Sequence, residues 1–239
     1  MSRHAILNSA EHGSLRVRAE PSAELGDAVM TVFTVPLEFR RIQHDFPILF
    51  RRDHATGRFS ALALLGFESG ENLFLDDGHW NADYRPLALA IQPFLVGRSA
   101  SGDGPAQIHI DLDHPRVSSG DDGVLLFDKT GSPTPYLEQV SAMLDELDVG
   151  YRASAAFFAA LERHDLLEPF SLDVELKDGS KHRMVGYHLI NEDKLRVLEA
   201  EAVAELHAEG HLMPIFMALA SLSNLPKLIA HKGRRDSNG

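Results

Sequence analysis

Leu172–Ile190 reads LDVELKDGSKHRMVGYHLI and carries the clearest local signal of secondary structure in the chain. From Leu172 onward, every second residue is apolar and the residues between are charged, which is the pattern of a half-buried strand. Asp178-Gly179 is a typical two-residue hairpin turn, and Arg183–Ile190 provides the returning strand. The sequence therefore predicts an antiparallel β-hairpin in the second half of the chain.

Helical periodicity lies on both sides of this hairpin. Before it, Thr134-Pro135 is a typical helix start, and apolar residues follow every three or four positions up to Leu161. Gly150 interrupts this stripe and could divide it into two helices. After the hairpin, Asn191 begins a helix that ends near Gly210. A last helix carries an apolar stripe made of Leu212, Phe216, Leu219, Leu222 and Leu225.

The first half reads as β-rich. Short runs that favour strands, separated by turn residues, are Val29–Val35, Pro47–Phe50, Phe59–Phe67 and Ile108–Leu112. Strands so close together indicate antiparallel pairing rather than βαβ crossovers. We therefore expect an α+β fold with an antiparallel β-rich N-terminal half and C-terminal helices packed around a β-hairpin. We expect a single domain over residues 1–239, with a possible subdivision in the loop region 99–133 and a frayed tail at 231–239.

Composition excludes several classes of protein. The chain has no Cys, so disulfides, thiolate metal sites and a Cys nucleophile are excluded. With 23 Lys+Arg against 35 Asp+Glu, the net charge of −12 argues against nucleic-acid binding, which needs a basic face. The hydrophobic content of 44% is that of a folded globular protein.

The cellular location follows from the lack of long apolar runs. The start Met1–Asn8 lacks the apolar core of a signal peptide. The longest apolar stretches, Phe59–Phe67 and Met213–Leu222, are shorter than the roughly 20 residues that a membrane span needs. We expect a soluble, cytoplasmic protein without a membrane span.

One candidate for chemistry is the His-x-Asp pattern at His109 and Asp111. On a strand both side chains share one face, and this pattern followed by a distant His is the ligand set of non-haem Fe(II) oxygenases. His182 and His188 are possible distal ligands, and Arg196 is a conceivable carboxylate clamp. The alternative is a strand whose polar residues face water, because a chance His-x-Asp is easy to obtain with 13 His.

The hairpin offers a second metal or acid–base cluster. If Asp178-Gly179 are the two turn residues, Glu175 lies opposite His182. Both then share a face with Asp173 and His188. The alternative is a solvated face with one cross-strand charge pair, worth up to ~1 kcal/mol.

Aromatic residues offer a third kind of site. Trp80, Tyr84 and Phe94 could line a small-molecule pocket, since Trp80 lies beside a predicted loop. The same residues could instead close the edge of the core. No phosphate-binding glycine loop, serine-hydrolase elbow or HExxH motif is present, so no catalytic residue is assigned.

Several framework segments match a known family. They are Pro47–Phe50, Leu62–Asp76, Gln92–Gly97, Ile108–Ser118, Leu166–Phe170, Leu172–Ile190 and Asn191–Leu195. In these segments the chain resembles the bacterial SapC family, which is named after surface-array (S-layer) proteins. The resemblance implies a link to S-layer biogenesis or to a neighbouring modification or uptake system, and it supplies no catalytic residues.

Two functions are expected on these grounds. The first is an accessory or binding protein with no cofactor, in which the stripes Leu137–Leu161 and Leu212–Leu225 could serve a homodimer or protein-partner interface as well as a core. The alternative is a metal-dependent oxygenase of the Fe(II), 2-oxoglutarate type, using His109, Asp111 and a distal His.

Histidine content predicts a solubility minimum. Protonation of all 13 His would move the net charge from −12 to +1, and most of this change falls between about pH 7.5 and 5.5. We expect light scattering to rise near pH 5.5, which is also the sequence pI. Scattering that stays flat from pH 8 to pH 5 would contradict the prediction.

Overall fold

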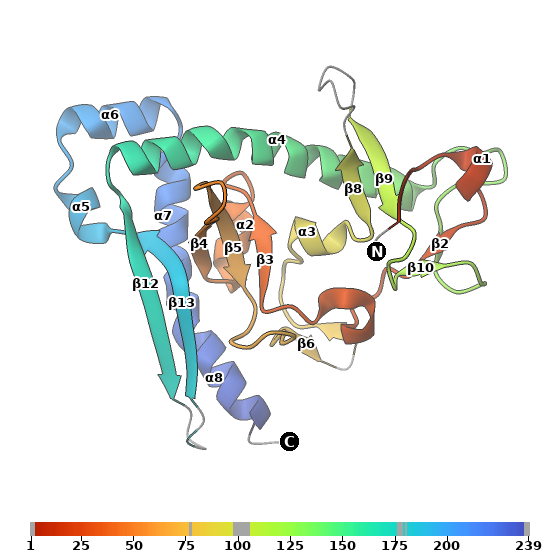
Figure 1. Ribbon diagram of the computed structural model, residues 1–239, viewed down its shortest axis with the longest axis horizontal. Helices are drawn as coiled ribbons and strands as arrows, with labels where there is room; N and C mark the ends of the chain where they lie inside the picture. Colours follow the sequence, from red (N-terminus) through yellow and green to blue (C-terminus); the bar gives the residue numbers. More distant parts are fainter. Residues whose placement is uncertain (1–2, 77, 98–105, 176–178, 180, 237–239) are drawn as a thin grey trace. The chain divides into compact units, whose positions relative to one another are not determined.

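The computed structural model describes residues 3–76, 78–97, 106–175, 179 and 181–236 (Figure 1). Antiparallel sheets and C-terminal helices confirm the predicted α+β class. The chain forms two compact units, and each is described by itself. Unit 1 comprises residues 1–28, 75–81 and 87–149, and unit 2 comprises residues 29–74, 82–86 and 150–239.

The expected subdivision of the chain stays a prediction, as does the single domain over 1–239. Residues 106–133 of the expected loop region 99–133 belong to unit 1, while residues 99–105 lie outside the described residues.

Unit 2 is built on a five-stranded antiparallel sheet in the order β12-β13-β4-β5-β3. Its strands are β3 (Thr31–Thr34), β4 (Ile48–Arg52), β5 (Phe59–Leu64), β12 (Leu167–Glu175) and β13 (Lys181–Ile190). Consecutive residues Ile48, Leu49 and Phe50 are all buried, so both faces of the central strand β4 are covered.

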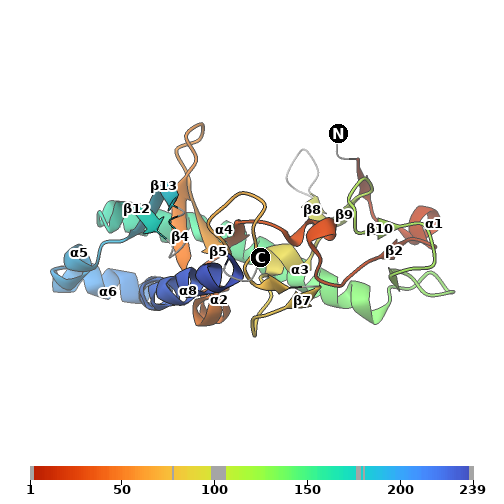
Figure 2. The same ribbon diagram turned by 90° about the horizontal axis from the view of Figure 1, so that it is seen from below.

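Helices α2 (Phe39–Asp45) and α7 (Leu212–Ser221) pack against this sheet. The other helical elements of unit 2 are the C-terminal part of α4 (Pro135–Arg163), α5 (Glu192–Arg196), α6 (Ala200–Ala208), the 3₁₀ turn η2 (Leu222–Asn224) and α8 (Leu225–Asp236). Figure 2 shows α2, α6 and α8 on one side of β4, β12 and β13. Aromatic rings fill the core, with Phe39 edge-on to Phe157 at 6.0 Å and Phe50 edge-on to Phe158 at 5.6 Å.

The described residues of unit 1 form three small antiparallel sheets, in the orders β1-β9-β8, β10-β2-β11 and β6-β7. The strands are β1 (His4–Ile6), β2 (Arg16–Val17), β6 (Leu75–Asp76), β7 (His79–Trp80), β8 (Phe94–Gly97), β9 (Gln107–Asp111), β10 (Val117–Ser118) and β11 (Val124–Leu125). Its helices are α1 (Ser9–His12), the π-helical turn η1 (Ala23–Asp27), α3 (Leu87–Ala90) and the N-terminal part of α4. Val17, Ile110, Leu126 and Val140 are fully buried in its core.

Helix α4 is continuous over 29 residues, although Gly150 could have divided it. Thr134 caps its start, because its hydroxyl accepts a hydrogen bond from the Leu137 N–H at 3.5 Å. A Cβ at position 150 would lie 2.5 Å from Cγ2 of Val35. Gly150 therefore allows close packing rather than ending the helix.

The hairpin is confirmed, but its expected register is wrong by one residue. Glu175 pairs with Lys181 and Val174 pairs with His182, whereas a two-residue turn would pair Glu175 with His182. Because a one-residue shift moves a side chain to the opposite face, His182 lies with buried Val174 rather than with Asp173 and Glu175. Five residues separate Glu175 from Lys181; of these, 176–178 and 180 lie outside the described residues.

The C-terminal tail also differs from expectation. Residues 231–236 of the expected frayed tail continue α8, while residues 237–239 lie outside the described residues. The Lys232 side chain is 7% exposed, and its ammonium group lies 2.7 Å from Glu71 Oε1 and 3.1 Å from Glu68 Oε1. A buried lysine with two carboxylate partners holds the last helix in place.

A buried ion pair organises unit 1. Nη2 of Arg116 donates to Oδ2 of Asp27 at 2.6 Å, and the side chains are 1% and 0% exposed. Nη1 of Arg116 also donates to the carbonyls of Arg18 and Glu20. One guanidinium thus ties the residues that follow β2 to the turn η1.

Loss of this pair should be costly. We expect Asp27→Asn to lower the free energy of unfolding by about 3–5 kcal/mol, since Arg116 would keep a buried charge without its counter-ion. Asp122→Asn is the matched control, because the Asp122 side chain is 62% exposed and 3.8 Å from Arg18, and this change should lower the free energy of unfolding much less. Urea unfolding measures both, and similar small losses in the two variants would contradict the prediction.

Candidate functional site

The candidate site is an exposed apolar strip on helix α7. The helix buries Ile215, Ala218 and Ser221, while Met213 is 56% exposed and Phe216 is 55% exposed. The buried side of the helix therefore differs from the expected one, because the expected stripe placed Phe216 on the same side as Leu219 and Leu222. The run Met213–Leu222 is apolar on nearly all sides, so its periodicity does not determine which side is buried.

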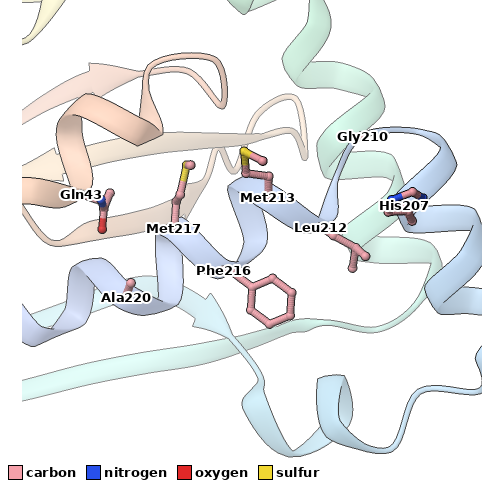
Figure 3. A pocket seen from close by; sticks show the side chains of 8 residues that line it. All are labelled: Gln43, His207, Gly210, Leu212, Met213, Phe216, Met217 and Ala220. Atoms are coloured by element: carbon pink, nitrogen blue, oxygen red, sulfur yellow. The ribbon is translucent and has the colours of Figure 1, made fainter.

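Two hollows lie along this helix. The first has a volume of about 610 Å³ and is lined by Gln43, His207, Gly210, Leu212, Met213, Phe216, Met217 and Ala220. Figure 3 shows its apolar side chains spread along α7, with Gln43 of α2 and His207 of α6 at its two ends. We call Leu212, Met213, Phe216, Met217 and Ala220 the α7 strip.

The second hollow, of about 300 Å³, shares Gly210, Met213 and Met217 with the first and also includes Leu37. Leu37 is 55% exposed, which extends the apolar surface beyond the helix. The two hollows can receive protruding apolar side chains of a partner, and the flexible methionines between them can adapt to the shape of those side chains.

Polar anchors fix α7 and its continuation on the other side. The Ser221 hydroxyl accepts from the Ile48 N–H at 2.8 Å and donates to the Ala218 carbonyl at 2.6 Å. Nδ2 of Asn224 donates to the Gln43 carbonyl at 3.0 Å. With Lys232 further along, these contacts hold one side of the helical stretch inward and leave the strip facing solvent.

The rim at the start of α7 is charged. Arg163 binds Glu205 at 2.8 Å and Glu209 at 3.0 Å. Nearby His211 lies 3.4 Å from Glu209. Burial lowers the pKa of His211, and Glu209 acts in the opposite direction. An apolar strip with a polar rim provides the chemistry of binding rather than a set of reacting groups.

The structure places the first pair of predicted metal ligands on β9 of unit 1. A Cβ at Gly97 would lie 2.1 Å from Nε2 of His109, so the imidazole packs directly on Gly97. Asp111 accepts from the backbone N–H groups of Arg3 at 3.2 Å and Asp113 at 3.1 Å. Both residues thus have structural contacts.

The predicted distal ligands lie on β13 of unit 2. Nδ1 of His182 is 3.0 Å from Oε1 of Glu68. The His188 ring is edge-on to Phe59 at 5.0 Å, and burial, followed by the charge of Arg52, lowers its pKa. Because β9 and β13 belong to different units, the Fe(II) triad stays a prediction.

The predicted ligand-binding residues are dispersed among different elements. Trp80 lies on β7 and Phe94 is 1% exposed in the core of unit 1, whereas Tyr84 belongs to unit 2. The Tyr84 hydroxyl donates to Oε1 of Glu38 at 2.9 Å. Arg196 forms exposed ion pairs within α5.

One feature of the sequence does indicate the α7 strip. An apolar segment without a polar face is either buried all round or exposes apolar surface. The helical stretch Leu212–Arg235 is long and apolar enough to cross a membrane by length and composition, as are some core helices of soluble proteins. Only 28% of its most apolar window is buried, so much of its apolar surface is accessible.

Comparison with known proteins gives one match. No curated protein and no solved structure matches the chain. The SapC family model matches residues 7–228, which is nearly the whole length. The chain therefore belongs to the SapC family.

Proposed function

We propose that this SapC-family chain is an accessory protein that acts by binding rather than by catalysis, and that its α7 strip binds a second copy of the same chain. The observation that carries the proposal is the exposed apolar surface of Met213, Phe216 and their neighbours on a firmly anchored helix. A role in S-layer biogenesis, or in a neighbouring modification or uptake system, is part of the proposal and rests on the family name.

The spacing of the strip supports self-association. Met213, Phe216, Met217 and Ala220 lie at positions i, i+3, i+4 and i+7 of one helix. This spacing forms the narrow stripe that one helix presents to another. A two-fold axis perpendicular to α7 would place identical stripes against each other in an antiparallel pair, and two-fold symmetric dimers are the commonest homo-oligomers.

Charges beside the strip favour the antiparallel arrangement. Glu205 and Glu209 lie near the start of α7, and Arg163 neutralises one of their two charges. Beyond the other end, α8 exposes the bases Lys227 and Arg234. An antiparallel pair would bring the acidic end of one copy toward the basic end of the other.

A membrane surface is the competing occupant, because apolar and basic residues together also bind anionic lipid. Two features oppose it. The net charge of −12 repels anionic headgroups. Glu205 and Glu209 lie close to the strip, where lipid contact would bring them against the membrane.

We expect sedimentation equilibrium at neutral pH to show a reversible dimer of the wild-type chain. Phe216→Glu should raise the dimer dissociation constant at least about tenfold, because it places a charge at the centre of the apolar contact. The matched control is Val197→Glu, since Val197 is also an exposed apolar residue, at 76%, but lies outside the strip. The control should associate like the wild type.

Three outcomes would contradict the proposal. The first is a wild-type chain that stays monomeric at about 100 μM. The second is an equal weakening of dimer formation by Phe216→Glu and Val197→Glu. The third is a monomer that binds anionic phosphatidylserine vesicles through Phe216. Circular dichroism of each variant establishes that it is folded.

A further inference from the structure

A group of three potential metal ligands lies in unit 2, apart from the residues predicted as ligands. His44 and Asp45 form the last turn of α2, and Asp83 lies in the loop 82–86. Nε2 of His44 is 3.2 Å from Oδ2 of Asp83 and 3.9 Å from Oδ1 of Asp45. The three ligand atoms all lie within 4.8 Å of one another.

These separations fit a shared ion. Donor atoms bound at about 2.1 Å to one tetrahedral ion are about 3.4 Å apart. The two measured distances lie on either side of this value, so small side-chain adjustments would bring all three atoms to bonding distance. The donors come from two segments that are 38 residues apart in sequence, Asp45 and Asp83, and the fold brings them together.

A second layer of hydrogen bonds positions Asp45. Its Oδ2 accepts from the Tyr84 N–H at 3.2 Å, which leaves Oδ1 directed at His44. The Tyr84 hydroxyl donates to Oε1 of Glu38, and Oε2 of Glu38 accepts from Thr34 at 2.7 Å. Glu38 is fully buried. Hydrogen-bonded carboxylates of this kind are typical supports of metal ligands.

We propose that His44, Asp45 and Asp83 form a binding site for a divalent transition metal of the zinc class. Imidazole nitrogen favours zinc and its neighbours in the first transition row over calcium and magnesium, and the two carboxylates supply balancing charge. The side chains of His44 and Asp83 are 66% and 86% exposed. The outer coordination positions are therefore open to water or to a further ligand.

The simpler interpretation of the same contacts is a surface ion pair between protonated His44 and Asp83. Such a pair contributes under about 1 kcal/mol and needs no fixed second layer. The two interpretations differ in one property. A metal site binds one divalent ion selectively through neutral imidazole, whereas an ion pair needs no metal.

The test is a metal titration of the chelator-treated full-length chain. Calorimetry with Zn²⁺ should show one strong equivalent, and Co²⁺ should give the visible absorption of a nitrogen- and oxygen-coordinated ion. His44→Ala should weaken Zn²⁺ binding at least about tenfold. Asp83→Asn should do the same, and it changes an exposed loop residue, which keeps the test valid if His44→Ala folds poorly.

His54→Ala is the matched control, since it removes another exposed histidine of unit 2 outside the cluster. It should leave the strong equivalent unchanged. Wild-type protein without a stoichiometric Zn²⁺ site would overturn the proposal. Equal losses in His44→Ala and His54→Ala would do so too, because they would indicate unspecific binding to surface histidines. The site does not depend on the α7 strip, so Phe216→Glu should bind Zn²⁺ like the wild type.

Discussion

Buried polar anchors on the helical stretch α7–η2–α8 determine how the C-terminal part of this protein is arranged. Ser221, Asn224 and Lys232 lie on the inward side of the stretch α7–η2–α8, where a water-soluble helix would normally bury only apolar residues. Each anchor has a specific partner: the Ile48 N–H, the Gln43 carbonyl, and the carboxylates of Glu68 and Glu71, respectively. Rotating the helical stretch about its axis would break several of these contacts at once. Each buried polar group left unpaired would then cost about 1–3 kcal/mol.

The exposed apolar strip follows from these anchors. Apolar burial alone is nearly indifferent to the rotation of a helix that is apolar on all sides, and polar contacts select one orientation. That orientation leaves Met213 and Phe216 in solvent, which is unfavourable for an isolated chain and useful for a binding protein. In the neighbouring helix α2, the Gln43 carbonyl accepts a hydrogen bond from Asn224, and Gln43 also lines the first hollow. The proposed metal ligand His44 is the next residue along this helix.

The sequence predicted the fold class and the hairpin because these depend on local patterns of polarity. Residue alternation in Leu172–Glu175 and the cap at Thr134 are independent of distant contacts. The hairpin register depended on turn length, which Asp178-Gly179 alone did not specify. The α7 strip and the cluster at His44 could not be predicted in the same way. The first depends on which side of the helix the anchors select, and the second on a contact between His44 and Asp83 that no local pattern encodes.

Cross-linking shows directly whether the α7 strip faces a second copy of the chain, as proposed. The chain has no Cys, so single-cysteine variants at positions 213, 216, 217 and 220 give unambiguous products. A disulfide requires Cα atoms within about 7 Å, so we expect oxidised dimers from one or more of these positions and none from Val197→Cys. Cross-linking at position 197 with none along α7 would contradict the proposal.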